Sequence, residues 1–207
     1  MPYARDERHC LVQTMREVGP SAPTLCGDWT ARDLAAHLVL RERRLDAAPG
    51  IVVGALSGYT DRVQRGIARW EWDVLLEKVD SGPPLWSPFR LVDEQANLGE
   101  MFVHHEDVRR AQDDWQVRAL PAGLPNRLWA LAARIGKLGY RRSPVGVVLE
   151  CPDGRRATVR SAGAATVTLR GEPSELLLHA FGRDQVRVEF DGAPADVEVV
   201  ATLDRSF

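Results

Sequence analysis

The spacing of apolar residues changes partway along the chain, and this change constrains the fold more than any other feature. Up to about residue 112, apolar residues recur every three or four positions, as on the buried face of an amphipathic helix. From about residue 145 they alternate with polar residues or form β-branched runs, which is typical of strands. The segment "WQVRALPAGLP", residues 115–125, is rich in proline and glycine and separates the two patterns. The sequence therefore predicts an α+β protein with a helical domain over residues 1–118 and a smaller α+β domain over residues 119–207.

The helical half contains four amphipathic segments, which together predict a four-helix bundle. Thr30 and Asp33 stand at the spacing of a capping box and predict where the second helix begins. The third segment carries a row of apolar residues at helical spacing, Val63, Ile67, Trp70 and Val74. Prolines in "DSGPPLWSPF" exclude a continuous helix between the third and fourth segments. The four predicted helices cover residues 7–18, 30–48, 59–79 and 91–112.

The second half mixes helices and strands. We expect a helix in "PNRLWALAARIGKL" and strands in "VGVVLE", "RATVRS" and "ATVTLR". The segment "PSELLLHAFGR" predicts a short helix that Ser174 could cap and Gly182 could close. In "QVRVEF", a final strand is predicted with Val186, Val188 and Phe190 on one face.

Composition and charge exclude several classes of partner. The formal net charge is -2 and the two signs are mixed, so there is no basic stripe of the kind that binds nucleic acid. No apolar run approaches the roughly 18 residues that a membrane-spanning helix needs. Because the first ten residues, "MPYARDERHC", are charged rather than apolar, we expect a cytoplasmic protein without membrane contact.

The cysteines do not predict a disulfide or a thiolate metal cage. Cys10, Cys26 and Cys151 are odd in number, lie far apart and form no C-x-x-C pair. We expect each to be a small residue of the core or of the surface.

The segment "NLGEMFVHHEDVRRA", residues 97–111, carries the residues most suited to chemistry. Glu100 and His104 are four apart and project to the same place on a helix, and Asn97 and Asp107 extend this polar stripe. Carboxylate oxygen and imidazole nitrogen both suit zinc, iron, nickel or manganese. Taken alone, however, the pair is also typical of a solvated helix face.

A third ligand candidate lies on the second predicted helix. In "DLAAHLVL", His37 stands between Leu34 and Leu38, on the apolar flank where a surface histidine is not expected. Taken alone, it could be a core histidine that hydrogen-bonds a neighbour such as Asp33. Together with Glu100 and His104, it fits the way bundles build metal sites from facing helices. Three protein ligands leave a position open for water or substrate, as in catalytic rather than structural zinc sites.

Three segments carry a resemblance to a known family. They are "LCGDWTARDLAAHLVLRERR", "GEMFVHHEDVRRA" and "VTLRGEPSELLLHAFGR". Together they resemble the DinB-like metalloprotein superfamily, in particular its mycothiol-dependent maleylpyruvate isomerase branch, which is common in actinobacteria. This resemblance implies a four-helix bundle that binds a divalent metal, usually zinc, through His37, Glu100 and His104. It also implies that the second domain is a sterol-carrier-like α+β domain.

The resemblance further implies an activity that depends on a thiol. A metal with an open position can bind a thiol such as mycothiol and present it as a thiolate. The expected function is then a thiol transferase or an isomerase that acts on a small electrophile. In the family an arginine of the second domain assists the active site, and Arg183 in "FGR" is the matching candidate here.

Several alternatives stay open at this stage. The chain could instead be a non-catalytic protein of the same fold that binds metal or another ligand, or its three candidate ligands could simply hydrogen-bond one another. His105 directly follows His104, so an exchange of ligands is open, and Asp107 or Glu106 could orient a histidine from outside the metal. The sequence predicts no oligomeric state.

Overall fold

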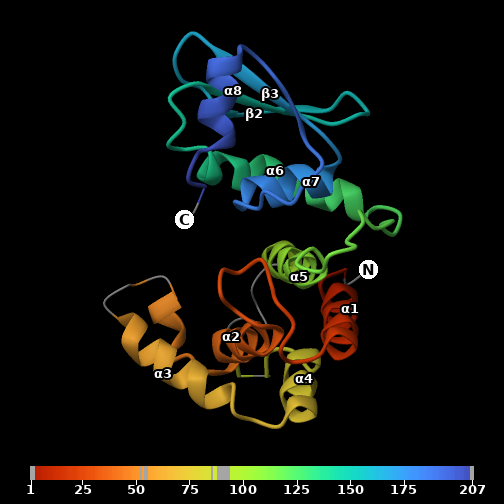
Figure 1. Ribbon diagram of the computed structural model, residues 1–207, viewed down its shortest axis with the longest axis vertical. Helices are drawn as coiled ribbons and strands as arrows, with labels where there is room; N and C mark the ends of the chain where they lie inside the picture. Colours follow the sequence, from red (N-terminus) through yellow and green to blue (C-terminus); the bar gives the residue numbers. More distant parts are fainter. Residues whose placement is uncertain (1–2, 52, 54–55, 85, 88–93, 206–207) are drawn as a thin grey trace. The chain divides into compact units, whose positions relative to one another are not determined.

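The computed structural model describes residues 3–51, 53, 56–84, 86–87 and 94–205 (Figure 1). Within these residues it holds eight α-helices and one four-stranded sheet, so the predicted α+β class is confirmed. Contacts between Cα atoms divide the chain into two compact units, Met1–Val117 and Arg118–Phe207.

The first unit is helical, with five α-helices in its described residues where the sequence predicted four. Helix α1 packs against α5 and α4, while α2 packs against α3 and α4. Their apolar faces form one core, which includes Leu11, Met15, Leu34, Leu38, Leu75 and Met101. The helices are α1 (Tyr3–Val18), α2 (Ala31–Arg43), α3 (Ser57–Ile67), α4 (Trp72–Asp80) and α5 (Glu94–Arg109), with a short 3-10 helix at Ala48–Ile51.

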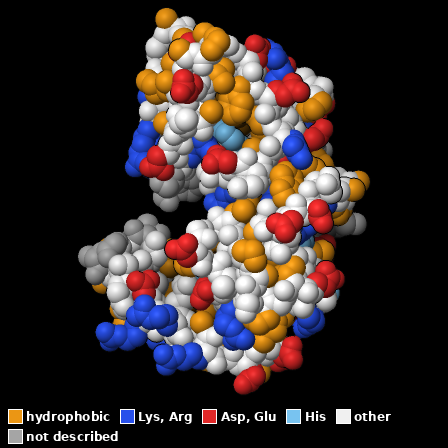
Figure 2. All heavy atoms as spheres, viewed as in Figure 1, with side chains coloured by type: hydrophobic (Ala, Val, Ile, Leu, Met, Phe, Trp, Pro, Cys, Tyr) orange, Lys and Arg blue, Asp and Glu red, His pale blue; other side chains and the backbone are white. Residues whose placement is uncertain are grey.

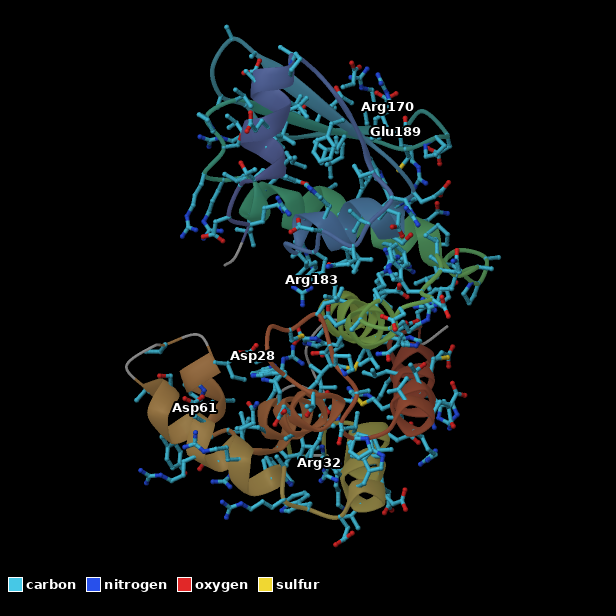
Figure 3. All side chains as sticks on the ribbon, viewed as in Figure 1. Asp28, Arg32, Asp61, Arg170, Arg183 and Glu189 are labelled. Atoms are coloured by element: carbon cyan, nitrogen blue, oxygen red, sulfur yellow. The ribbon has the colours of Figure 1, made fainter. Side chains whose placement is uncertain are left out.

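The prediction of one helix over residues 59–79 is wrong, because this segment forms two helices, α3 and α4, with a turn between them. Arg32 of α2, labelled in Figure 3, donates from Nη1 to Ala68 O at 3.0 Å and to Trp70 O at 2.8 Å. The carbonyls at the break are therefore satisfied by a different helix, which no local pattern reveals. Trp70 and Val74 are 40% and 44% exposed, so they do not share the buried face of Ile67.

The predicted capping box at the start of α2 is confirmed. Thr30 N donates to Asp33 Oδ2 at 3.0 Å, and Asp33 N donates to Thr30 Oγ1 at 3.3 Å. The Asp33 carboxylate thus caps the helix rather than binding His37. The fourth predicted helix is present as α5, while residues 91–93 of that prediction lie outside the described residues.

The second unit is a mixed sheet with helices packed on it. Its strand order is β2-β1-β3-β4, with β1 parallel to β3 and the other pairs antiparallel. Helix α6 packs against α7 and β2, and α8 packs against β3 (Figure 1). A Cβ on Gly139 would lie 2.3 Å from Ala180 O, so only glycine allows α6 to approach α7 this closely. The elements are α6 (Leu124–Gly139), β1 (Gly146–Glu150), β2 (Arg156–Arg160), β3 (Thr166–Arg170), α7 (Pro173–Ala180), β4 (Glu189–Asp191) and α8 (Pro194–Ala201).

The start predicted for α7 is wrong, while its predicted end is confirmed. Pro173 occupies the first turn, so Glu172 is the N-cap, and Ser174 donates to Glu175 Oε1 at 3.3 Å instead of capping. Gly182 has a φ of +83°, the left-handed conformation that commonly ends a helix.

The last predicted strand is shorter than expected. Only Glu189–Asp191 pairs with β3, although Val186, Val188 and Phe190 are all half-buried as the alternation predicted. Arg170 and Glu189, labelled in Figure 3, are partners in this short ladder. Helix α8 follows, and its valine-rich sequence "PADVEVVA" gave no helical prediction.

A buried histidine should make the second unit sensitive to acid. The Tyr140 hydroxyl donates to His179 Nδ1 at 2.5 Å, and both side chains are buried. Burial, with the charge of Arg205, lowers the pKa of His179 from 6.5 to about 3. When pH falls below 6.5 the unfolded chain takes up a proton, whereas folded His179 stays neutral until about pH 3, so stability decreases.

We therefore expect the chain to lose about 3 kcal/mol of stability between pH 7 and pH 4 through His179. Urea unfolding of the wild type and of His179→Asn at several pH values would measure this loss. Asparagine keeps an acceptor for Tyr140 but does not titrate, so the variant should lose less. Equal losses in the two proteins would contradict the prediction.

Candidate metal centre

The three predicted ligand candidates come together in the first unit. His37 of α2 and Glu100 and His104 of α5 each offer a ligand atom, and these atoms lie within 4.8 Å of one another. His104 Nε2 is 3.2 Å from Glu100 Oε1, and the centroids of the His37 and His104 rings are 5.8 Å apart. We call these residues the triad. Their role as metal ligands stays a prediction.

Local structure explains why these side chains converge. Glu100 and His104 are one turn apart on α5, which places them on one face. His37 is one turn after Asp33, whose capping box fixes where α2 begins. Trp29 lies just before α2. The centroid of its ring is 5.0 Å from the centroid of the His37 ring, and the two ring planes are tilted by 48°.

Asp107 and Cys26 adjoin the triad on the far side of His104. His104 Nδ1 lies 3.0 Å from Asp107 Oδ2, and the Cys26 thiol donates to the same oxygen at 3.1 Å. The sequence left Asp107 open as a residue that orients a histidine, and this contact places it there. The sequence gave no such role to Cys26, because Cys26 and Asp107 are 81 positions apart.

His105 points away from the triad. Its Nδ1 lies 2.6 Å from Glu7 Oε1, and its Nε2 lies 2.9 Å from Thr14 Oγ1, both on α1. Both ring nitrogens therefore have partners on α1, and the side chain is 5% exposed. Glu106 likewise accepts hydrogen bonds from Arg109 and Arg110 instead of orienting a triad histidine. The exchange of His104 for His105, open from the sequence, does not fit this arrangement.

Two triad residues already have the protonation state that a divalent metal needs. Burial, together with the charge of His104, lowers the pKa of His37 to about 4, so its imidazole is neutral at pH 7. Burial alone would raise the pKa of Glu100, but the hydrogen bond with His104 and the nearby positive charges outweigh it and lower the pKa to about 2. Glu100 is thus ionised, and metals bind neutral imidazole and ionised carboxylate.

His104 differs, because it lies between acceptors. Burial would lower its pKa, but hydrogen bonds with Asp107, Cys26 and Glu100 outweigh burial and raise the pKa well above 6.5. Without metal, the ring is therefore an imidazolium that bridges two carboxylates. Metal binding has to displace the proton on Nε2, while the proton on Nδ1 can stay with Asp107.

Two further side chains near the triad were missed by sequence reasoning. Arg41, one turn after His37, has its Nε 3.6 Å from Glu100 Oε1 and is only 15% exposed. Its segment "RERR" could collect an anionic ligand but is more typical of a solvated face, so sequence reasoning left Arg41 out of the site. Gln64 of α3 donates from Nε2 to Asp33 O at 3.5 Å, one turn before His37.

Arg183, the predicted catalytic residue, belongs to the second unit. It lies just after α7, as labelled in Figure 3, and donates from Nη1 to Phe181 O at 2.7 Å. It lines a pocket of about 460 Å³ together with residues that include Asp184, Thr202 and Arg205. Its catalytic role stays a prediction.

On the face shown in Figure 2, acidic and basic side chains are interspersed and form no continuous basic stripe. Among the described helices, none is long and apolar enough to cross a membrane.

Comparison with known proteins identifies the first part of the chain. Residues 4–71 match the sequence model of the family described as mycothiol maleylpyruvate isomerase N-terminal domain. The match includes His37 and ends before Glu100 and His104. Searches of curated proteins and of solved structures found no match to the chain. Residues 4–71 are therefore similar to the mycothiol maleylpyruvate isomerase N-terminal domain family, which confirms the predicted DinB-like, maleylpyruvate isomerase-like resemblance for this part of the chain.

Proposed function

We propose that the protein binds one divalent metal ion through His37, Glu100 and His104, and that it acts with a low-molecular-weight thiol on a small electrophile. The observation that carries this proposal is the approach of the three ligand atoms to within 4.8 Å of one another. The family of residues 4–71, named for a mycothiol-linked isomerase, supports a thiol of the mycothiol type and an isomerase or transferase reaction. Zinc is our first candidate, and nickel, manganese and iron suit the same donors.

The donor set fits such a metal. Two imidazoles and one carboxylate are a known ligand combination for catalytic zinc, and three protein ligands leave one position open. When bound there, the metal would supply a Lewis acid that lowers the pKa of a coordinating thiol.

The chain's own residues would then prepare the site. His37 and Glu100 hold the required protonation states at neutral pH, and Asp107 keeps the proton on His104 Nδ1. Arg41 adds a positive charge 3.6 Å from Glu100, which favours an anionic group such as a thiolate near the triad. Trp29 packs against the His37 ring, and His37 is only 7% exposed.

The competing proposal is a non-catalytic protein in which the metal serves stability or sensing. Such a structural site normally has four protein ligands. Among the described residues, His105 cannot supply the fourth without leaving Glu7 and Thr14. Asp107 and Cys26 would be the other candidates, but they bond each other and His104 Nδ1 rather than facing Glu100. This favours the open site and therefore the enzyme.

Metal content and thiol consumption test the proposal in two steps. Elemental mass spectrometry of protein purified without a metal-affinity tag should find about one divalent metal per chain. Loaded protein should then consume mycothiol, or another low-molecular-weight thiol, with at least one compound of a broad electrophile panel. His37→Ala is the matched control and should do neither.

Each step has its own contrary result. Wild-type protein without metal, even after reloading with zinc, nickel or manganese, would remove the metal from the proposal. Metal without any thiol consumption would favour the non-catalytic protein. Unfolding on chelation would point the same way, because structural metal contributes directly to folding.

A further inference from the structure

Asp107 lies where two segments distant in sequence meet beside the triad. Its carboxylate is fully buried, and Oδ2 is within hydrogen-bond distance of both His104 Nδ1, at 3.0 Å, and Cys26 Sγ, at 3.1 Å. A buried carboxylate is costly unless donors surround it, and the donors to Asp107 include an imidazole and a thiol.

The contact determines which nitrogen of His104 faces the triad. A carboxylate only accepts hydrogen bonds, so Nδ1 must carry a proton to bond Asp107. Nε2 faces a carboxylate too, that of Glu100, but this contact is longer, 3.2 Å against 3.0 Å, and Glu100 is 25% exposed whereas Asp107 is fully buried. When the ring is neutral, the proton is therefore expected to stay on Nδ1 and the lone pair to be on Nε2. We propose that Asp107 and Cys26 form a positioning pair, which fixes His104 in the tautomer and orientation that present Nε2 to a metal. The metal part of this inference rests on the proposed function, whereas the tautomer does not.

The backbone places Cys26 for this role. Leu25 N donates to Asp107 O at 3.0 Å, so the segment next to Cys26 is anchored to the same residue whose side chain Cys26 contacts. Cys26 N also donates to Thr24 Oγ1 at 3.2 Å, and Thr24 Oγ1 donates to Trp29 O at 2.7 Å. The loop before α2 is thus held at both the backbone and the thiol. The thiol keeps Asp107 Oδ2 directed at His104.

The same three side chains suggest a rival role for Cys26. Ligand atoms of Cys26, His104 and Asp107 also lie within 4.8 Å of one another, so the thiol could itself bind the metal. In the positioning role Cys26 is a thiol that donates a hydrogen bond to Asp107. In the rival role it must be a thiolate, which gives Co²⁺ a charge-transfer band that nitrogen and oxygen ligands do not give.

Metal affinities of variants form the first test, measured by competition with a chromophoric chelator for Zn²⁺ on the full chain. Asp107→Asn should weaken binding about 10- to 100-fold, the usual effect of losing the carboxylate behind a ligand histidine. The side-chain amide of asparagine can donate a hydrogen bond to His104 Nδ1. A neutral His104 ring then carries its proton on Nε2. Cys26→Ser retains a donor and should bind nearly as the wild type, whereas Cys26→Ala should lose roughly three- to tenfold. His105→Gln, on the same helix but facing α1, is the matched control and should not change the affinity.

The tautomer itself forms the second test and needs no metal. Long-range ¹H–¹⁵N NMR correlations on metal-free wild type, at an alkaline pH where the His104 ring is neutral, should show the proton on Nδ1. In Asp107→Asn it should move at least partly to Nε2. Wild-type protein that lacks metal affinity but keeps the Nδ1 proton would defeat the proposed function and leave the positioning pair standing.

Three results would overturn the inference. One is a wild-type proton on Nε2, which requires no variant to fold. Another is a folded Asp107→Asn, judged by circular dichroism, that keeps both the wild-type tautomer and the wild-type affinity. The third is a thiolate band with Co²⁺ that disappears in Cys26→Ser, since Cys26 would then be a ligand rather than a positioning residue.

Discussion

Replacing His104 by alanine should weaken metal binding by at least about a hundredfold, whereas replacing the adjacent His105 by glutamine should leave it unchanged. Zinc sites with four ligands contribute roughly 10–16 kcal/mol, or about 3 kcal/mol per ligand, and about 1.4 kcal/mol corresponds to a factor of ten in affinity. His104 points to Glu100, while His105 points to Glu7 on α1. Two histidines next to each other in sequence thus serve two different sites.

Chelator competition and unfolding measure the two effects separately. His104→Ala should lose affinity, and His37→Ala and Glu100→Ala should lose a comparable amount. His105→Gln should instead cost about 1–3 kcal/mol of stability, because the buried carboxylate of Glu7 loses a charge-assisted partner. Weaker metal binding in His105→Gln, with an unaffected His104→Ala, would reverse the assignment.

The sequence predicted the parts of this site that depend on helical geometry. The four-residue step from Glu100 to His104 places both on one face of α5 whatever surrounds that helix. The capping box at Thr30 and Asp33 likewise determined where α2 begins, and with it the face that carries His37. Such inferences need only the spacing of residues along one helix.

What the sequence could not predict depends on contacts between distant segments. Glu7 lies 98 positions from His105, and only the packing of α1 against α5 decides that His105 turns toward it. Where the predicted helix over 59–79 is interrupted, the carbonyl of Ala68 is bonded by Arg32 of α2, which lies 36 positions away in the sequence. In both cases a polar group is satisfied by a partner that no local pattern can identify.

In the second unit, too, some elements could be predicted from local sequence patterns and others could not. Its strands and α7 were predicted from local periodicity and turn residues, and Gly182 ends α7 as expected. Helix α8 was not predicted, because a valine-rich segment of eight residues is equally compatible with a strand. For Arg183, the resemblance supplied a role that the contacts of its own unit leave untested.

A buried ion pair holds α2, and with it His37, against its neighbours. Arg8 of α1 donates from Nη1 to Glu42 Oε2 at 3.0 Å and to Val79 O of α4 at 2.9 Å, and its Nη2 also bonds Glu42. Arg8 and Glu42 are 6% and 1% exposed. Ser87 Oγ further donates to Glu42 O at 2.7 Å, so the end of α2 is bonded directly to α1 and to the segment of Ser87, and through Arg8 to α4.

Glu42→Ala should therefore destabilise the chain by about 3–5 kcal/mol, because it leaves the guanidinium of Arg8 buried without its carboxylate. Urea unfolding of metal-free protein would measure the loss. Replacing both residues by apolar ones, as in Arg8→Met with Glu42→Leu, should cost much less, since no charge is then left buried. As a control, Asp204→Ala breaks the exposed pair with Arg142 and should cost below about 1 kcal/mol.

Glu42→Ala also tests whether the ion pair that holds α2 affects metal binding at the triad. Glu42 is five positions after His37 on α2, and its hydrogen bonds are to Arg8 and Ser87 rather than to the triad or the positioning pair. If the ion pair fixes the helix that carries His37, Glu42→Ala should also weaken metal binding, even at temperatures where the variant is fully folded. The double variant should recover part of that affinity, because α2 would again pack against α1 without a buried charge. A folded Glu42→Ala with wild-type metal affinity would instead show that the capping box and the packing of Trp29 are enough to hold His37 in place.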